Sequence, residues 1–420
     1  MSSKSDLFER PVGAPLLAST NTARVRDQAF SGFDLPQELQ SLSDVLREFV
    51  KKEICPVEAS LDPTERAIPE DKLALLQAKA RQLDFWCLDA PVEFGGGGLS
   101  TFQMTVVWEQ ASRHRFAFPV PGGGVFGYSP PVPLYSGNDD QIDRYVRPAI
   151  AKGLKTFTAI SEPTGGSDPA RAMRTTAVRQ GDHFVLNGRK MWSTNADEAD
   201  FGVVYARTDP AKGRAGISAF VLETNTPGMH VSKIPVMRNH WTTEIALENC
   251  KIPVENLIGK EGEGFGLAQK WMVRGRLMLA SQALGVAEEA IRLAVDWAKE
   301  RETFGALLAT RQGIQFPLAD SLVELNAARL LTWQAAWKDD QGEDARVEAS
   351  MAKLYASEMG FRVVDRAIQI LGGMGLAKEM NLEHWFRDLR TMRIVEGGSE
   401  IQRYLIARDM LGAAAIGRRD

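Results

Sequence analysis

Residues 284–298 read LGVAEEAIRLAVDWA, and their apolar positions have the spacing of a long amphipathic helix. Leu284, Ala287, Ile291, Ala294 and Ala298 recur every three or four residues, so they line one helix face. A second stripe with this spacing follows at Leu318, Leu322, Leu325, Ala328 and Leu331. After the polar break at residues 339–342 (DDQG), a third helix is expected from Glu343 to the glycines at 372 and 373. Long helices joined by short connections predict a bundle.

The chain before this bundle has two other textures. Residues 35–155 are mostly helical in pattern, and residues 156–265 contain short runs rich in β-branched and aromatic residues, at 184–186, 203–205 and 217–222. Asn187 and Gly188 predict a tight turn between two of these strands. We therefore expect a mainly α protein with a central β domain. The expected parts are a leader (1–34), an N-terminal helical domain (35–155), a middle β domain (156–265), a helical bundle (266–412) and a tail (413–420).

Composition excludes several classes of protein. The 420 residues are 44% hydrophobic and 25% charged, which is the balance of an ordinary globular protein with two or three subdomains. A net charge of −4 gives no sign of a nucleic-acid or anionic-membrane binder. Cys55, Cys87 and Cys250 lie far apart, so neither a disulfide framework nor a zinc site is expected. No membrane span is expected, and the early acidic residues Asp6 and Glu9 argue against a signal peptide, so we predict a cytoplasmic protein.

Two features that suggest other functions are set aside. Gly122, Gly124 and Gly127 match G-x-G-x-x-G by letter, but the prolines at 119, 121, 130, 131 and 133 exclude the helix that a dinucleotide-binding motif opens. The five histidines are scattered, at 114, 183, 230, 240 and 384, and no pair has ligand spacing, so no metal site is expected.

Five segments together resemble one family. Residues 158–168 (TAISEPTGGSD) are similar to the TEPxxGSD signature of acyl-CoA dehydrogenases, and residues 188–196 (GRKMWSTNA) to their G-x-K-x-W-x-T-N segment. Residues 301–305 (RETFG) followed by Gln312, residues 365–373 (DRAIQILGG) and residues 387–402 (RDLRTMRIVEGGSEIQ) match three further elements. The resemblance covers residues 40–412 in the family's order. It implies a helical domain, a β-barrel-like domain and a four-helix bundle, in agreement with the three textures.

The resemblance also implies a reaction. Members of that family use FAD to dehydrogenate an acyl-CoA thioester to the trans-2-enoyl-CoA: a base removes the α proton, and flavin N5 accepts the β hydride. The base is a glutamate, and Glu396 occupies its motif position. An apolar pocket should raise the pKa of this carboxyl towards neutrality, which suits a general base. The alternative from spacing alone is a surface carboxylate at the start of the helix near Ser399.

Two other positions compete for the role of the base. Some family members carry it on the first bundle helix near Arg276, where this chain has Gly275, which favours Glu396. Glu400 stands where the family has a cofactor-contacting glutamine, so it is predicted to bind the cofactor rather than to catalyse.

The remaining site residues follow from motif position. Those predicted to contact FAD are Thr158, Ile160, Ser161, Ser167, Trp192, Ser193, Thr194, Arg301, Thr303, Phe304, Gln312, Gln369, Gly372, Gly373, Gly398 and Glu400. Those predicted to contact substrate are Ser167, Arg276, Val395 and Gly397. The resemblance places the set from Arg301 to Gly373 at the ADP half of FAD across a dimer interface. The alternatives are that Trp192 is β-domain core and that Arg301 is a solvated helix end.

The chain departs from the family pattern in ways that concern the substrate. Gly398 replaces a usual threonine, Val395 an aromatic residue that lines the thioester pocket, and Val273 a polar residue that contacts CoA. Residues 116–133 (FAFPVPGGGVFGYSPPVP) should form a rigid, irregular loop where the family has a helix. The aromatic rings of this loop, at Phe118, Phe126 and Tyr128, would narrow the acyl pocket and favour short, branched or cyclic acyl groups.

The sequence therefore predicts an FAD-dependent acyl-CoA dehydrogenase that passes electrons to an electron-transferring flavoprotein and assembles as a homodimer or a dimer of dimers. An acyl-CoA oxidase or a flavin monooxygenase of the same fold, or a non-enzymatic acyl-CoA-binding module, remain as alternatives. The retained Glu396 argues against the last two.

Overall fold

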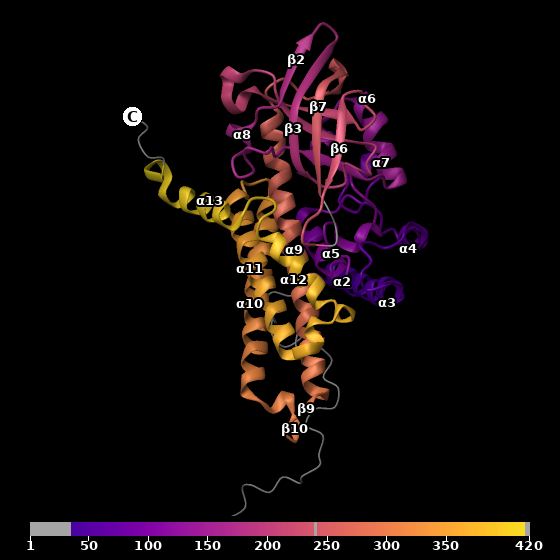
Figure 1. Cartoon of the computed structure of the whole chain (residues 1–420), viewed down its shortest axis with the longest axis vertical. Helices are drawn as coiled ribbons and strands as arrows, with labels where there is room; N and C mark the ends of the chain where they lie inside the picture. The colour runs from indigo at the N-terminus through magenta and orange to yellow at the C-terminus, as the bar shows by residue number, and fades with distance from the viewer. Residues whose placement is uncertain (1–34, 239–241, 416–420) are drawn as a thin grey trace, which may run out of the picture. The chain divides into compact units, whose positions relative to one another are not determined.

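A computed structural model describes residues 35–238 and 242–415 (Figure 1). The expected leader (1–34) and the last part of the expected tail (416–420) lie outside the described residues. From residue 42 onward, the described residues form one compact unit. Its N-terminal helices are α2 (Gln37–Phe49), which begins before the unit, α3 (Cys55–Ala59), α4 (Glu70–Gln82) and α5 (Thr101–Ala111), followed by the shorter α6 (Asp139–Gln141) and α7 (Arg147–Lys152).

Helix α5 begins where its sequence provides a capping box. The Ser100 hydroxyl accepts a hydrogen bond from the backbone N–H of Gln103, whose side chain in turn accepts one from the backbone N–H of Ser100. Such reciprocal bonds satisfy two donors that a helix start leaves unpaired. After α5 the chain is irregular, with two short 3₁₀ helices at Pro121–Gly124 and Val132–Ser136. The prediction of an irregular loop over residues 116–133 is therefore confirmed.

The middle of the chain forms an eight-stranded sheet with the order β6-β7-β3-β2-β4-β5-β8, in which β1 pairs with β4. The strands are β1 (Thr156–Ala159), β2 (Thr176–Gln180), β3 (His183–Ser193), β4 (Phe201–Arg207), β5 (Ile217–Glu223), β6 (Met229–Ile234), β7 (Thr242–Pro253) and β8 (Leu257–Ile258), with the short helix α8 (Pro169–Ala172) after β1. Both faces are covered: Val203 and Tyr205 of β4 join one buried cluster, while Val204 and Ala206 join another. This alternation is the two-residue period of a strand.

One turn prediction in this sheet is wrong. Asn187 and Gly188 lie inside β3, where the pairing with β7 shifts register between Leu186 and Gly188. The actual turn between β2 and β3 lies at residues 181–182, since Gln180 pairs with His183. Gly188 has a φ of +150° and lies so close to Thr175 that a side chain would clash with it. The glycine thus marks a bulge and a close backbone approach, which the dipeptide alone does not distinguish from a hairpin turn.

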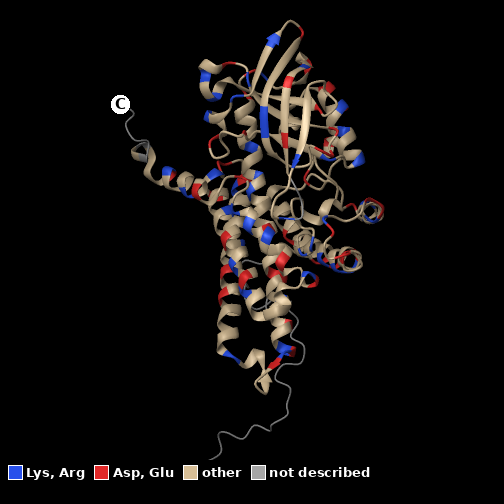
Figure 2. Cartoon of the chain, in the orientation of Figure 1, with Lys and Arg blue, Asp and Glu red and all other residues tan. Residues whose placement is uncertain are grey.

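The C-terminal part is a bundle of long helices: α9 (Gly264–Glu300), α10 (Gln312–Asp340) and α11 (Arg346–Leu371), with α12 (Leu382–Met392) and α13 (Ser399–Leu411) after them. A small hairpin of β9 (Glu302–Thr303) and β10 (Ala306–Leu307) joins α9 to α10. Helix α11 packs along α9, and α10 and α5 complete the bundle around α9. Figure 2 shows both signs of charge interspersed on these helices, as a net charge of −4 leads one to expect.

Small residues and one buried ionic cluster explain how closely these helices pack. Ala280, Ala283, Ala287 and Ala290 of α9 are fully buried, so neighbouring helix backbones approach closely. Between α5, α9 and α10, the guanidinium of Arg329 donates to the carboxylates of Glu109 at 2.7 Å and Glu288 at 2.9 Å. The chain connections that leave this core carry the residues of the candidate site.

Candidate active site

The predicted base, Glu396, lies in a tight turn between α12 and α13. Glu396 has a φ of +54° and Gly397 one of +88°, so two successive residues adopt left-handed backbone conformations. The left-handed region is strained for a residue with a side chain and is often found at functional sites. The turn aims the Glu396 carboxyl at α9, where a Cβ built on Gly275 would lie 3.2 Å from Oε2 of Glu396. The glycine thus leaves the space that the carboxyl fills.

Burial dominates the electrostatics of Glu396. It raises the pKa of this carboxyl above its ordinary value, while the nearby charges of Arg276 and Lys353 act in the opposite direction. Arg276 is buried, and its Nε lies 3.4 Å from the Glu396 carbonyl oxygen, while its Nη1 donates to Ser350 at 3.2 Å. The structure therefore brings the predicted substrate contact Arg276 to the predicted base. Some of the Glu396 surface stays accessible, as proton transfer to or from a ligand requires.

The other predicted residues of this turn surround Glu396. Val395 packs against the bundle core, and Gly398 is the residue before the first turn of α13. Glu400 is exposed in that first turn, one turn away from Glu396 along the chain. The structure thus separates the two carboxylates by environment, because only that of Glu396 is enclosed.

The first two motif segments meet in the β domain. The backbone N–H of Met191 donates to the Ser161 carbonyl at 2.9 Å, which ties β3 to the chain after β1. Beside this bond, the buried Lys190 ammonium donates to the Glu162 carboxylate at 2.8 Å and to the Ile160 carbonyl at 3.3 Å. Sequence reasoning gave Glu162 and Lys190 no role. The sequence did carry a signal for this pair, because each is a charged residue inside an otherwise half-buried motif. Buried charges are usually paired.

Trp192 has the exposure that a ligand contact needs. The pairing of β3 with β7 shifts register between Met191 and Ser193, and Trp192 at this bulge has a φ of +66°. Bulges beside active sites redirect side chains, and here Trp192 is 53% exposed. The alternative that Trp192 is β-domain core is therefore excluded. Ser193 next to it is buried, and its carbonyl accepts a hydrogen bond from the Thr243 hydroxyl at 2.6 Å.

The hydroxyls near Trp192 are free. Within the described part of the chain, the side chains of Thr158 and Thr194 have no hydrogen-bond partner, and both are partly exposed. An exposed indole with two unpaired hydroxyls at neighbouring strand ends suits a planar, polar-edged ring such as the isoalloxazine of FAD. Ser167 is exposed in the loop that follows, and Ile160 is buried below the strand end.

The second group of predicted FAD contacts lies at the far end of the bundle. Phe265, at the start of α9, packs with the β-domain cluster, whereas Arg301 follows the last residue of that helix. A helix of 37 residues is about 55 Å long, at a rise of about 1.5 Å per residue. The predicted contacts of this second group are all exposed or partly exposed: Arg301, Thr303, Phe304, Gln312, Gln369, Gly372 and Gly373. One chain therefore does not bring them to Trp192.

A cavity of about 200 Å³ lies between the N-terminal helices, the β domain and α9. Trp108 of α5 and the loop residues Phe126 and Tyr128 line it, together with Asn195 and Met278. Met278 is three residues beyond Gly275, hence on the helix face that contacts Glu396. The cavity thus reaches the Gly275 face of α9 on one side and the strand end after Thr194 on the other, whereas Glu396 itself is not among its lining residues.

The three aromatic rings of the loop at residues 116–133 do not all lie at this cavity. A side chain at Gly122 would clash with the Phe126 ring and one at Gly124 with the Tyr128 hydroxyl, so these glycines leave room for both rings. Phe118 does not line the cavity; the Arg238 guanidinium lies 4.5 Å from its ring centre. Two of the three rings expected near an acyl group therefore do line the cavity.

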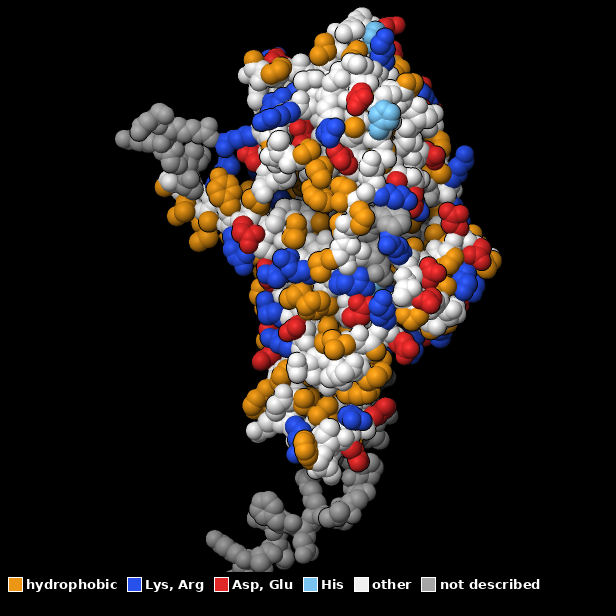
Figure 3. Space-filling model, viewed as in Figure 1, with side chains coloured by type: hydrophobic (Ala, Val, Ile, Leu, Met, Phe, Trp, Pro, Cys, Tyr) orange, Lys and Arg blue, Asp and Glu red, His pale blue; other side chains and the backbone are white. Residues whose placement is uncertain are grey.

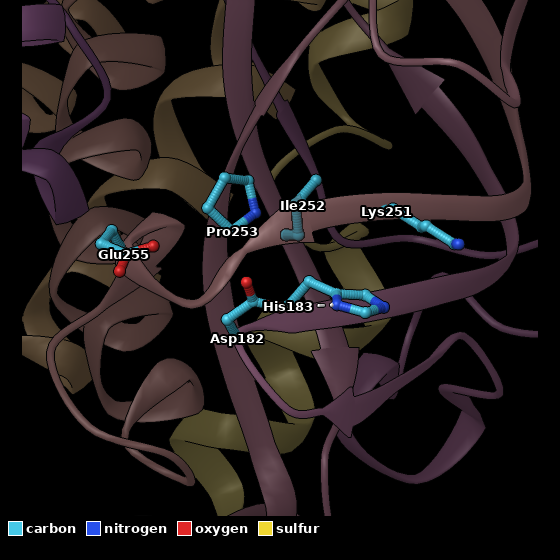
Figure 4. A pocket seen from close by; sticks show the side chains of 6 residues that line it. All are labelled: Asp182, His183, Lys251, Ile252, Pro253 and Glu255. Atoms are coloured by element: carbon cyan, nitrogen blue, oxygen red, sulfur yellow. Dashed lines mark hydrogen bonds and ion pairs between the residues drawn. The ribbon is translucent and has the colours of Figure 1, made fainter.

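A larger hollow of about 390 Å³ lies on the β domain but holds none of the predicted site residues (Figure 4). The residues that line this hollow are Asp182, His183, Lys251, Ile252, Pro253 and Glu255. Figure 4 draws the hydrogen bond between the His183 ring and the Asp182 carboxylate. Among the described residues, no cluster of three or more His, Cys, Asp or Glu side chains could hold a metal ion.

Comparison with known proteins gives three adjoining matches. Models of the N-terminal, middle and C-terminal domains of acyl-CoA dehydrogenase match residues 36–153, 158–250 and 262–411. The chain belongs to the acyl-CoA dehydrogenase family. It is 39% identical over 390 residues to the short-chain specific acyl-CoA dehydrogenase of rat mitochondria, covering 91% of this chain and 92% of that protein.

Solved structures agree with this membership. The butyryl-CoA dehydrogenase of Megasphaera elsdenii superposes with a TM-score of 0.80 at 30% identity, over 90% of this chain and 99% of that one. An FAD complex of PigA superposes with a TM-score of 0.82 at 27% identity, over 90% of this chain and 98% of that one. The chain is therefore an oxidoreductase of the acyl-CoA dehydrogenase family, and its cofactor is FAD. Within the described residues, no helix is both long and apolar enough to cross a membrane.

Proposed function

We propose that this acyl-CoA dehydrogenase converts an acyl-CoA thioester to the trans-2-enoyl-CoA, with Glu396 as the base. One observation carries the proposal: the Glu396 carboxyl lies against Gly275 of α9, three residues before the cavity-lining Met278, in surroundings that raise its pKa. A base works best when its pKa approaches the working pH, because it is then ionised yet still has a high affinity for the proton. Glu400, exposed on α13, has no such enclosure.

The chain's own residues would prepare the substrate for proton loss. The α proton of a thioester is weakly acidic, so its removal needs both a fixed base and stabilisation of the developing negative charge. The turn at 396 and 397 fixes the carboxyl, and the walls of the cavity exclude water from the acyl group. When bound, FAD supplies the acceptor for the β hydride. Thr158, Trp192 and Thr194 would hold the flavin ring at the mouth of the cavity.

The cavity also suggests the size of the acyl group. About 200 Å³ is small for a long straight chain, and the rings of Trp108, Phe126 and Tyr128 form much of its wall. We therefore propose a preference for short, branched or cyclic acyl groups. The similarity to short-chain and butyryl-CoA dehydrogenases supports this preference.

Assembly and electron transfer form the last part of the proposal. Phe304 is fully exposed at the hairpin between α9 and α10, about a helix length away from Trp192 of the same chain. A second chain could supply Arg301, Phe304 and Gln312 to the ADP half of FAD, so we propose a homodimer or a dimer of dimers. Figure 3 shows apolar side chains on the solvent side of α13, where Tyr404, Met410 and Leu411 are exposed. We propose a cytoplasmic protein whose electron acceptor is an electron-transferring flavoprotein.

The proposal is tested by anaerobic bleaching of the bound FAD with a panel of acyl-CoA esters. Glu396→Gln keeps the shape of the side chain but removes the base, so flavin reduction should slow by a factor on the order of 10² to 10⁴. Glu400→Gln is the matched control and should change the rate far less. Near wild-type reduction by Glu396→Gln, or a larger loss in Glu400→Gln, would show that the base is wrongly identified.

The same substrate panel, tested again in air with an oxygen electrode, separates the alternative functions. An acyl-CoA oxidase would consume oxygen at turnover rate without any added electron acceptor. A flavin monooxygenase would need a reductase and would not be bleached by acyl-CoA. A binding module would bind acyl-CoA and leave the flavin oxidised.

A further inference from the structure

The turn that presents Glu396 is supported from below by buried donors. The amide of the buried Gln402 donates to the carbonyl oxygens of both Glu396 and Gly397, each at 2.9 Å. The Nζ atom of Lys353, in the middle of α11, donates to the Gly397 carbonyl at 2.7 Å. Carbonyls that are held in this way fix the left-handed backbone at 396 and 397, and with it the direction of the Glu396 side chain.

A buried lysine is an unusual donor for a hydrogen bond to a backbone carbonyl such as that of Gly397. The side chain is fully buried, and none of the carboxylates in the described residues forms an ion pair with it. A buried ammonium without an ion-pair partner is costly, and an amide or a hydroxyl could donate the same bond without a charge. Holding the backbone therefore does not by itself explain why the donor at this position is charged.

Four charged groups surround Lys353. Burial lowers its pKa to about 8; Glu396, Glu358 and Glu400 favour its charged form, and Arg276 opposes it. Glu358 has other partners, since it accepts from the Ser399 hydroxyl at 2.7 Å and from Arg393. Glu400 is exposed on α13. Among these three carboxyls, Glu396 is the one that is neither exposed nor paired with another cation, and the attraction acts on both groups: the Lys353 charge lowers the pKa of Glu396 against the effect of burial.

We propose that Lys353 is a positioning residue for Glu396: it fixes the turn through the Gly397 carbonyl, and its charge favours the ionised carboxylate. This inference rests on the proposed role of Glu396 as the base. Without the Lys353 cation, Arg276 would be the remaining nearby positive charge that opposes burial, and less of the carboxyl would be ionised at a given pH. Since Lys353 keeps its proton below about pH 8, this support is present at neutral pH and is lost as the pH rises through that value.

The test compares Lys353→Met with Lys353→Arg, measured as flavin reduction per bound FAD over a range of pH. Lys353→Met removes both the charge and the donor. Its kcat and kcat/KM should fall together by about 10²-fold, the size of loss that a small misplacement of a reacting group can cause. The acidic limb of its pH profile should move up by about one pH unit, because the base then loses a nearby positive charge. Lys353→Arg keeps the charge, so the acidic limb of its pH profile should lie at the wild-type pH.

A second readout does not depend on turnover. Difference infrared spectroscopy of the protonated carboxyl, with Glu396→Gln subtracted, gives the pH at which Glu396 titrates. That midpoint pH should be higher than the wild-type value in Lys353→Met and equal to it in Lys353→Arg. The control is Lys338→Met, which removes a lysine at the end of α10 that pairs with Glu348. This variant should leave both the midpoint and the rate unchanged.

The outcomes separate this inference from the proposed function. A purely structural lysine would lower FAD content or the unfolding temperature, with the rate per bound flavin and the midpoint unchanged; that result overturns the inference alone. If Glu396→Gln reduces its flavin at the wild-type rate, both the base and the positioning role are wrong. If Lys353→Met does not fold, Lys353→Gln, which keeps a donor but removes the charge, takes its place: an acidic limb and a Glu396 midpoint that move up support the inference, and wild-type values of both overturn it.

Discussion

Replacement of Lys190 by methionine tests how the β domain holds the strand edge that carries Trp192. The change removes the ammonium that pairs with Glu162 at 2.8 Å and leaves the carboxylate buried. Breaking a buried pair by removing one partner costs about 3–5 kcal/mol. The carboxylate keeps its bonds from the backbone N–H groups of Arg174 and Thr175, at 2.6 and 3.0 Å, and from the Thr175 hydroxyl at 2.6 Å. We therefore expect the lower end of that range, about 3 kcal/mol.

The assay is thermal unfolding of the FAD-loaded protein, with flavin fluorescence to detect release. At about 2–4 °C per kcal/mol, Lys190→Met should lower the transition of the β domain by on the order of 10 °C and weaken FAD retention. The matched control is the double variant Glu162→Gln with Lys190→Met. It should recover most of the loss, because it leaves no uncompensated buried charge. An unfolding temperature and flavin release equal to wild type in Lys190→Met would refute the reasoning, as would a double variant that shows the sum of the single losses.

Two further predictions concern the cavity and the assembly. Phe126→Ala enlarges the cavity, so the optimum of kcat/KM should move to longer acyl groups in a series of straight acyl-CoA esters from about four to about sixteen carbons; a wild-type optimum at about twelve carbons or longer would contradict the proposed preference. Arg301→Ala should weaken FAD binding although Arg301 lies far from Trp192 in its own chain, and light scattering should find the FAD-loaded enzyme as a dimer or larger. A stable monomer that retains FAD would contradict this second prediction.

The sequence by itself determined the parts that depend on local spacing. Stripes such as Leu284 to Ala298 predicted the bundle helices, because a helix period of three to four residues is written directly in the chain. The irregular loop at residues 116–133 followed from its prolines, which cannot continue a helix. The family and its cofactor followed from motifs in a fixed order, and the comparisons confirm both. The role of Glu396 remains a prediction from its motif.

Only the tertiary structure decided which residues meet across the chain. Gly275 makes room for the Glu396 carboxyl, and Lys353 donates to Gly397, although neither contact follows from any period in the sequence. The Asn187–Gly188 pair shows the limit of local reasoning, since the same letters serve a hairpin turn or a bulge and the neighbouring strand decides between them. The physical reason is general. A repeat fixes which side of an element faces inward, whereas burial and the partners of a buried charge depend on residues that arrive from distant parts of the chain.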